Sequence, residues 1–201
     1  MKKTLTALLL ATSLSGFAKN GSDLAFPKGS ITVTAGTAVP NYLGIITILG
    51  GSKSGPYQVG VQYMLTNRLA IGAQFSTSGA TTSSKTNYDY FTNTSYDYKF
   101  KLGLRTFMAN ADYYWMHKKK VALYTGIAAG YAGVKVSTSF SDNQDHSNDV
   151  SFSALGSGIS YQIKAIGLRA NFVKGLGIYA DLGYGLNGIV GLGLQYTIKG
   201  K

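Results

Sequence analysis

The sequence predicts an all-β protein, an eight-stranded antiparallel transmembrane β-barrel preceded by a cleavable signal peptide. Three observations predict it. The chain begins like an exported protein, and charged residues make up only 13 % of it, about half the ~25 % usual for a soluble domain. Segments of barrel-strand length also alternate large apolar residues with small or polar ones. No run of 18 or more apolar residues follows the start, so spanning helices are not expected.

The first 18 residues have the layout of a secretory signal. Lys2 and Lys3 form a positive start, Leu5 to Leu14 form a short apolar stretch, and Ala18 ends a small-residue cleavage site. We therefore expect residues 1–18 to be a signal peptide and residues 19–201 to be one outer-membrane barrel domain. A retained membrane anchor is the alternative, but the apolar stretch is well short of the ~20 residues that a spanning helix needs.

The first three expected strands lie before residue 77. The first covers Ser30–Ala38, and the second, Tyr57–Leu65, alternates strictly between large apolar residues and Gln, Gly or Met. A short turn at Thr66–Arg68 leads into a third strand that begins at Leu69. This hairpin is the clearest barrel-like pattern in the chain.

The middle of the chain predicts two more strands separated by a polar segment. We expect Thr77–Tyr96 to be a long loop, Asp97–Tyr114 to be the fourth strand and Val121–Ser137 to be the fifth, joined by a basic turn at Trp115–Lys120. The apolar parity of the fourth strand changes near Arg105, which a β-bulge at Arg105–Thr106 would explain.

Three further strands complete the count. The expected elements are a polar loop at Ser139–Asp149, a sixth strand at Val150–Ile163, an unassigned connection at Lys164–Gly175, a seventh strand from Leu176 to Tyr184, a tight turn at Gly185–Gly188 and an eighth strand at Val190–Ile198. Eight strands put both chain ends on the side of the short turns, which is periplasmic in outer-membrane barrels.

A soluble eight-stranded barrel of the lipocalin or avidin type is the structural alternative. Such a protein places its apolar face inward and interspersed Lys and Glu outward. Here the face opposite the large apolar residues carries Gly, Ala, Gln, Ser and Thr, and the chain has no Glu. That face suits a tight interior, so the pattern favours the membrane barrel.

Three stretches resemble small outer-membrane barrel proteins of the OmpW/OmpX/OmpA-like group, in particular the porin-like versions of Bacteroidota. They are VGVQYMLTNRLAIGAQF, ADYYWMHKKKVALYTGIAAGYAGVKV and GIYADLGYGLNGIVGLGLQYTI. The resemblance implies an outer-membrane location, with lipids and lipopolysaccharide as the surroundings. The last strand partly matches the signal for the barrel-assembly machinery, with Gly193 followed by Tyr196 and Ile198.

The charge of the chain is strongly positive. The formal net charge is +11, and removal of Lys2 and Lys3 with the signal leaves +9. The basic residues are scattered or lie at strand ends, with Lys118–Lys120 as the only run. Attraction to anionic lipid headgroups explains this pattern, and we do not expect nucleic acid as a partner.

The residue types needed for catalysis or metal binding are sparse. There is no Cys, and all eight acids are Asp. His117 and His146 fall near opposite ends of the expected barrel. Asp145, His146 and Asp149 could form a hydrolase fragment or a weak divalent-cation site, but a solvated polar loop has the same composition. We therefore expect no enzyme, no metal and no cofactor, and keep an envelope lipid-modifying enzyme as a minor alternative.

Charged residues on inward-facing positions form the candidate lumen site. Arg105, Asp112 and Asp181 lie on faces expected to point into the barrel, and Arg169 is a further candidate. A buried charge needs a partner, so we expect Asp181 to pair with Arg105 or Arg169. A structural strut is the main interpretation, and a gate on a solute path is the alternative.

A second candidate site lies in the first long loop. Tyr42, Ile45, Ile46 and Leu49 have helical spacing and could form a lid over the barrel mouth, although a resumed strand or a short rim helix has the same pattern. Two functions stay open. The first is a porin-like barrel that passes or docks a small solute, and the second is a structural or adhesive barrel with a closed lumen whose outer loops bind a surface partner.

Overall fold

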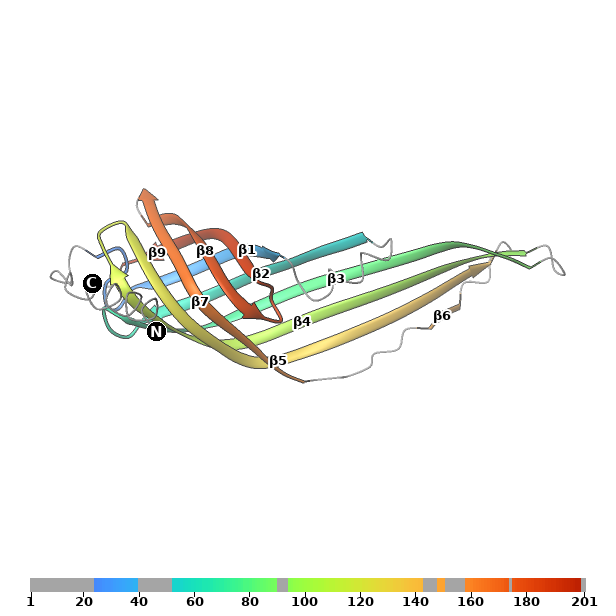
Figure 1. Ribbon diagram of the computed structural model, residues 1–201, viewed down its shortest axis with the longest axis horizontal. Coiled ribbons are helices and arrows are strands. Elements are labelled where there is room, and N and C mark those ends of the chain that lie inside the picture. The colour runs from blue at the N-terminus through green and yellow to red at the C-terminus, as the bar shows by residue number, and fades with distance from the viewer. Residues whose placement is uncertain are drawn as a thin grey trace, which may run out of the picture.

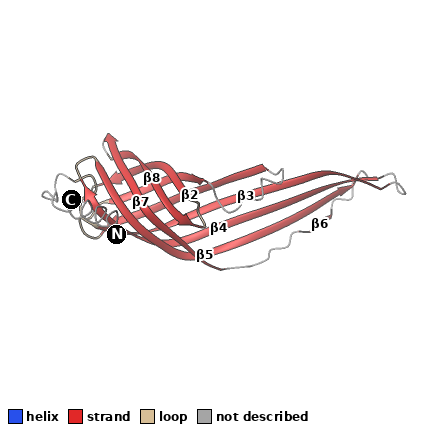
Figure 2. Cartoon of the chain, viewed as in Figure 1, coloured by secondary structure: helices blue, strands red, loops and turns tan. Residues whose placement is uncertain are grey.

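The computed structural model describes residues 24–39, 52–89, 94–142, 148–150, 158–173 and 175–199. These residues form one antiparallel sheet (Figures 1 and 2). Its strands are β1 (Ile31–Val39), β2 (Ser52–Met64), β3 (Leu69–Asp89), β4 (Thr94–His117), β5 (Val121–Asp142), β6 (Asn148–Val150), β7 (Gly158–Val173), β8 (Leu176–Gly185) and β9 (Val190–Ile198). Within the described residues, no helix is long and apolar enough to cross a bilayer.

Eight of these strands close a ring. In the order β1, β2, β3, β4, β5, β7, β8 and β9, each strand pairs with the next, and β9 pairs with β1 to complete the circle. The short β6 pairs with the far end of β5 and lies outside the ring of eight. Closure leaves no sheet edge along the ring, which is the condition for a sheet to span a membrane.

The barrel is apolar outside and polar inside. Large hydrophobic side chains on the outer wall are exposed, among them Ile127, Tyr131 and Leu194 at 60 % or more. The polar or charged side chains that are buried include Thr32, Gln62, Ser76, Asn110, Asp112, Gln162, Lys164, Arg169, Gln195 and Thr197. This arrangement reverses that of a soluble barrel, and it confirms the eight-stranded antiparallel transmembrane barrel that the sequence alternation predicts.

Two of the expected long loops are in large part strand. β3 continues to Asp89 and β4 starts at Thr94, so the expected loop Thr77–Tyr96 is mostly one hairpin. β5 likewise continues to Asp142, into the expected loop Ser139–Asp149. As a result β3, β4 and β5 extend well beyond the other strands on one side of the barrel (Figure 1). Polar residues such as Ser and Thr form strands readily, but without a buried face they show no alternation.

The strand expected at Val150–Ile163 is displaced toward the C-terminus. β7 begins at Gly158 and continues to Val173, so it contains most of the connection that the sequence left unassigned. The bulge expected at Arg105–Thr106 is also wrong, because the β3–β4 register is continuous from Leu69↔Tyr113 to Lys85↔Asp97. The strand stays regular and the apolar residues change face instead, since Leu104 points inward together with Thr106 and Met108.

The two sides of the barrel differ. We call the side that contains the connections at 65–68 and 118–120 and residue Gly175 the turn end, and the opposite side the loop end. Ala25 donates to the Lys118 carbonyl at 2.9 Å, and Thr197 donates to the Gly175 carbonyl at 2.8 Å. The first and last described segments therefore both lie at the turn end, as the strand count predicts.

Candidate functional site in the barrel lumen

A buried carboxylate on β4 lies at the centre of the lumen. Asp112 is fully buried, and both of its oxygens contact the ammonium of Lys164 on β7, at 3.0 and 3.1 Å. The side-chain amide of Gln62 on β2 also donates to Asp112, and Arg169 Nη2 lies 3.9 Å away. We call Asp112, Lys164, Arg169 and Asp181 the lumen charge cluster.

A bulge in β7 brings both basic residues to the same face. The β7–β8 register shifts between Lys164 and Ile166, so Ala165 has no partner on β8. Before the shift the even-numbered Lys164 points inward, and after it the odd-numbered Arg169 does. A bulge that re-aims side chains in this way is a recognised feature of barrels. Two cations therefore face the lumen from one strand.

Asp181 on β8 has a different partner from the one expected. It accepts a hydrogen bond from the hydroxyl of Tyr124 on β5, and Arg169 stacks over the Tyr124 ring with its Cζ 5.0 Å from the centroid. Arg105 is exposed on the outer wall, so the expected Asp181–Arg105 pair is wrong. Among the described side chains, the ion pairs of the lumen are Asp112 with Lys164 and with Arg169.

Two glycines make room for this cluster, which leads to a first prediction. A Cβ on Gly126 would collide with the carboxylate of Asp112, and one on Gly167 would collide with the ring of Tyr124. We expect Gly126→Ala and Gly167→Ala each to lower the free energy of unfolding by about 1–3 kcal/mol, as overpacking does. The measurement is urea unfolding of the folded barrel in detergent, followed by the fluorescence of Trp115. Gly133→Ala is the matched control, since nothing lies within 4 Å of its Cβ; equal losses in all three variants would contradict the packing argument.

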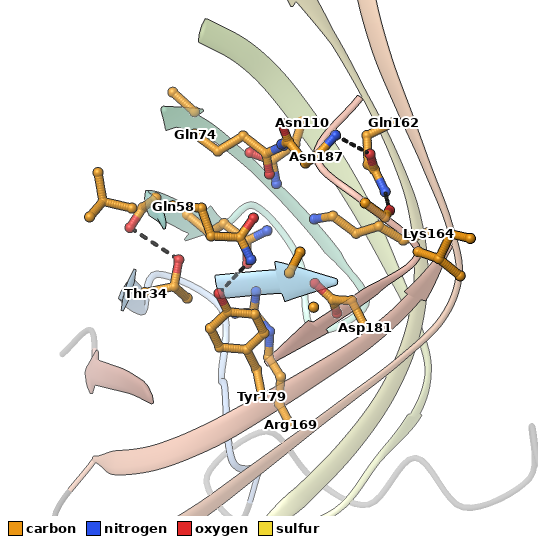
Figure 3. Close-up of a pocket in the computed structure, with 18 residues that line it drawn as sticks. Thr34, Gln58, Gln74, Asn110, Gln162, Lys164, Arg169, Tyr179, Asp181 and Asn187 are labelled. Atoms are coloured by element: carbon orange, nitrogen blue, oxygen red, sulfur yellow. Dashed lines mark hydrogen bonds between the residues drawn. The ribbon is translucent and has the colours of Figure 1, made fainter. Parts of the chain in front are cut away.

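The lumen holds a small polar cavity next to the charge cluster. Side chains from around the ring point into it, including Gln58, Tyr179 and Asn110 (Figure 3). Its volume is about 40 Å³, which has room for a few water molecules. Several buried atoms there have no partner among the described residues, namely Gln62 Oε1, Asn110 Oδ1, Arg169 Nε and Nη1, and Asn187 Nδ2. Such atoms are ordinarily satisfied by ordered water.

The turn end of the lumen is closed by the segment Leu24–Ser30, which we call the N-terminal plug. Phe26 is completely buried, with its ring 5.9 Å from the Tyr114 ring and 5.7 Å from the His117 ring. Arg169 also lies over the Phe26 ring, with its Cζ 5.9 Å from the centroid. Backbone bonds fix the plug to two turns, including one from Lys28 to the side chain of Asn67 at 2.9 Å. The sequence pattern does not predict this plug, because a single aromatic residue outside a strand leaves no periodic signal.

His117 binds the N-terminal plug only when its imidazole ring is neutral. Its Nδ1 lies 2.8 Å from the Asn67 carbonyl, and its Nε2 lies 2.9 Å from the backbone nitrogen of Phe26. The carbonyl can only accept and the backbone N–H can only donate, so Nδ1 carries the proton and Nε2 is bare. Partial burial at the turn end, outside the apolar band, lowers the pKa of His117 from its ordinary value, against the opposing effect of the Asn67 carbonyl.

The second prediction is that the plug loosens in acid. Because the folded-state pKa lies below the unfolded value of about 6.5, the stabilisation is complete above that pH and is lost as the pH falls toward the folded pKa. Protonation of His117 Nε2 places its N–H against the backbone N–H of Phe26, so the hydrogen bond between these two atoms is lost. We expect trypsin to cleave after Lys28 faster at pH 5.5 than at pH 8, relative to cleavage of an exposed reference peptide at each pH. His117→Gln, which can keep one donor and one acceptor, should lose this dependence; the same pH response in the variant would assign it to another group.

The loop end of the lumen is covered by the β8–β9 connection, Leu186–Ile189, which we call the turn lid. Asn187 Oδ1 accepts from Ser76 Oγ at 2.7 Å and from Thr106 Oγ1 at 3.1 Å, on the opposite wall. Gln162 donates to the Gly188 carbonyl at 3.0 Å. Leu186 packs against an apolar cluster of Ala80, Leu104 and Ala132. Because β8 and β9 have only 10 and 9 residues, their connection reaches across the barrel rather than above it.

Some expected site residues lie where the structure makes no statement. The lid candidates Tyr42, Ile45, Ile46 and Leu49 fall outside the described residues, as do the signal peptide, Asp145 and His146. The backbone of Asp149 is described, in β6, but its side chain is not. Within the described part of the chain, no group of three or more His or Asp residues could hold a metal ion.

Comparison with known proteins finds similar folds and no close relative. No protein-family model matches the chain, and no curated protein matches it. Among solved structures, Ail, the attachment invasion locus protein of Yersinia pestis, in complex with the heparin analogue sucrose octasulfate, is 16 % identical with a TM-score of 0.44, over 85 % of this chain and 99 % of that one. The N-terminal β-barrel domain of Pseudomonas aeruginosa OprF is 16 % identical with a TM-score of 0.42, over 85 % and 98 %.

Proposed function

We propose that this protein is an outer-membrane barrel of the small OmpW/OmpX/OmpA-like group with a closed lumen, whose extended β3–β5 sheet is an external binding surface. The observation that carries this proposal is the threefold obstruction of the lumen. The N-terminal plug closes the turn end, the lumen charge cluster fills the middle, and the turn lid crosses the loop end. A passive role of this kind needs neither a catalytic residue nor a cofactor.

The length of three adjacent strands supports the external surface. The turn lid contacts β3 at Ser76, while β3 continues to Asp89. At ~3.3 Å per residue, the part of β3 from Ser76 to Asp89 extends roughly 40 Å along the strand beyond the closed lumen. A transmembrane strand needs only about 9–11 residues, so a membrane span does not explain the 21, 24 and 22 residues of β3, β4 and β5. The extension is a surface held out from the membrane.

Solute passage through the lumen is the second candidate function. It is favoured by the polar lining, by the buried atoms without partners and by the small residues of β5 that face the lumen, such as Ala128. A path would require the N-terminal plug, the lumen charge cluster and the turn lid all to move. The two functions differ in what an intact barrel does in a planar bilayer.

Planar-bilayer conductance and liposome swelling test the closed lumen. We expect the refolded wild-type barrel to be silent in both assays, although a gel-mobility shift between boiled and unboiled samples shows that it is folded and inserted. Steady single-channel conductance from the wild type would favour the solute path. Asn187→Ala, which removes the bonds of the lid to Ser76 and Thr106, should stay silent as well, because the N-terminal plug and the lumen charge cluster still obstruct the lumen; conductance in this variant alone would make the turn lid the gate of a solute path.

Shortening the β3–β4 hairpin tests the external surface. Residues Thr82 and Phe100 face each other in the register, so residues 82–100 can be replaced by an Asn-Gly turn that joins Thr81 to Lys101. We expect cells that display this variant to lose adhesion to a panel of immobilised glycans and matrix proteins, while barrel assembly is unchanged. Undiminished adhesion would move the binding surface elsewhere.

A further inference from the structure

The outer wall of β3, β4 and β5 carries an ordered series of residues from the apolar band toward the loop end. Phe75, Phe107 and Tyr131 pair across the three strands in one row, and all three are exposed. Toward the loop end, the next outer-wall row along β4 contains Arg105, and the two rows beyond it contain Gly103 and Lys101. Exposed aromatic rings mark the interface between lipid chains and headgroups. The basic residues therefore lie at the level of the headgroups.

Three cations converge on one glycine in these rows. Lys135 on β5 is directly opposite Gly103, so Lys101 and Arg105 are its two diagonal neighbours on the same face. Diagonal positions lie about 7–8 Å apart, within reach of long side chains. Gly103 has no side chain to separate them, and nothing but Lys135 lies within 4 Å of its Cβ position. Lys101, Gly103 and Lys135 line a hollow of about 450 Å³ next to Arg105, together with four hydroxyl residues, Ser52, Ser54, Thr81 and Ser137.

No described carboxylate neutralises this group, which we call the basic cluster (Lys101, Arg105 and Lys135). The acids with described side chains are Asp112 and Asp181, and both face the lumen. Like charges on neighbouring positions repel one another, and an anion bound among them would relieve that repulsion. The hydroxyl groups add donors that suit phosphate oxygens.

A second hollow lies on the same strands, on the other side of the aromatic row. Ala73, Ala109 and Ala129 pair across β3, β4 and β5. Larger side chains such as Tyr63, Ile71 and Ile127 border them and leave an open, apolar groove of about 680 Å³. We call it the alanine groove. From the turn end toward the loop end, the outer-wall residues of β4 are Ala109, Phe107 and Arg105 in that order, so the groove and the basic cluster lie on either side of the aromatic ring at 107.

We propose that this face of the barrel binds one phosphorylated, acylated lipid of the outer leaflet. The basic cluster holds its phosphates, and the alanine groove holds part of an acyl chain. This inference rests on the proposed outer-membrane location. The order of cations, aromatic row and apolar groove matches the order of phosphate, sugar and acyl chain in such a lipid. A protein or polysaccharide partner would not bind in the alanine groove, which lies on the other side of the aromatic row.

Native mass spectrometry of the full barrel in detergent tests this site, with hexa-acylated bisphosphoryl lipid A, its dephosphorylated form and phosphatidylglycerol as probes. We expect bisphosphoryl lipid A to bind one per barrel, and the variant K101Q/R105Q/K135Q to bind it at least about tenfold more weakly. The matched control K118Q/K119Q/K120Q removes the same charge at the turn end and should stay within about twofold of the wild type. The groove-filling variant A109L/A129L should weaken lipid A binding without weakening that of a soluble bisphosphorylated glucosamine disaccharide.

Each result supports or overturns the proposal. Equal loss of lipid A binding in K101Q/R105Q/K135Q and K118Q/K119Q/K120Q would show only general charge attraction and overturn the site. Equal binding of dephosphorylated lipid A, or no effect of A109L/A129L, would overturn the assignment of phosphate or acyl chain. Displacement of lipid A by a heparin fragment that binds independently of the groove would assign the cluster to a polysaccharide. A barrel that stays monomeric in buffer without detergent would instead remove the proposed membrane location itself.

Discussion

Replacing Asp112 with Asn is expected to lower the free energy of unfolding by about 3–5 kcal/mol, the range for a buried ion pair that loses one partner. The substitution keeps the shape of the side chain and removes its charge. Lys164, with its ammonium 3.0 Å from the Asp112 carboxylate, then loses its ion-pair partner, and two buried cations, Lys164 and Arg169, share the one remaining acid, Asp181. The measurement is urea unfolding in detergent, followed by gel mobility and by the fluorescence of Trp115.

A double variant separates charge from packing. Asp112→Asn together with Lys164→Met leaves one acid, Asp181, and one base, Arg169, so the lumen is neutral again. We expect the double variant to be more stable than Asp112→Asn alone, with a coupling that a double-mutant cycle measures. Arg105→Gln is the control, because Arg105 is exposed and should change stability by less than about 0.5 kcal/mol. Additive losses in the two single variants would show that the ion pair is not the source of the effect.

The lumen charge cluster shows what the sequence pattern could and could not predict. Asp112 and Asp181 were placed inside correctly, because each lies in a segment whose alternation is set by lipid on one side. The pattern puts Arg105 inside because its neighbours Leu102 and Leu104 are as apolar as lipid-facing residues, whereas in the structure Leu104 is buried and Arg105 is exposed. Beyond the turn lid the interior is itself apolar, around Ala80 and Leu104, so hydrophobicity no longer distinguishes the two faces.

Lys164 was missed for a different reason. The alternation of Ser160, Gln162 and Lys164 is regular, and all three are buried, but the bulge at Ala165 interrupts it and makes the following residues resemble a connection. A one-residue insertion reverses every later side chain. The extended parts of β3, β4 and β5 were missed because, outside the membrane, both faces of a strand meet water and no period is imposed. The fold class therefore follows from the membrane-spanning part of each strand, whereas the plug, the lid and the β3–β5 extension require the structure.

The plug and the charge cluster form one unit. Arg169 contacts both the Phe26 ring of the plug and the Tyr124 ring, whose hydroxyl donates to Asp181. A cation held over aromatic rings in a desolvated site gains about 2 kcal/mol or more. Loss of the plug therefore exposes one end of the cluster to water, and the two elements should weaken together.

Replacing Phe26 with Ala is expected to lower the free energy of unfolding by about 3–5 kcal/mol, the usual loss for a fully buried Phe. The ring fills the turn end of the lumen between Tyr114, His117 and Arg169, and none of its surface is exposed. Without it, hydrogen bonds alone hold the plug, among them those from the backbone N–H groups of Ala25, Lys28 and residue 26. We expect trypsin to cleave after Lys28 faster in the folded variant than in the wild type at pH 8, and urea unfolding to give the free energy.

Phe172→Ala is the matched control for this prediction. The same ring is removed from the outer wall of β7, where Phe172 is 58 % exposed, so no cavity forms and the loss should stay below about 1 kcal/mol. Conductance should remain absent in Phe26→Ala, because the charge cluster and the turn lid still obstruct the lumen. Conductance in this variant alone would make the plug the gate of a solute path. Unchanged stability and unchanged cleavage would show that Phe26 does not close the turn end.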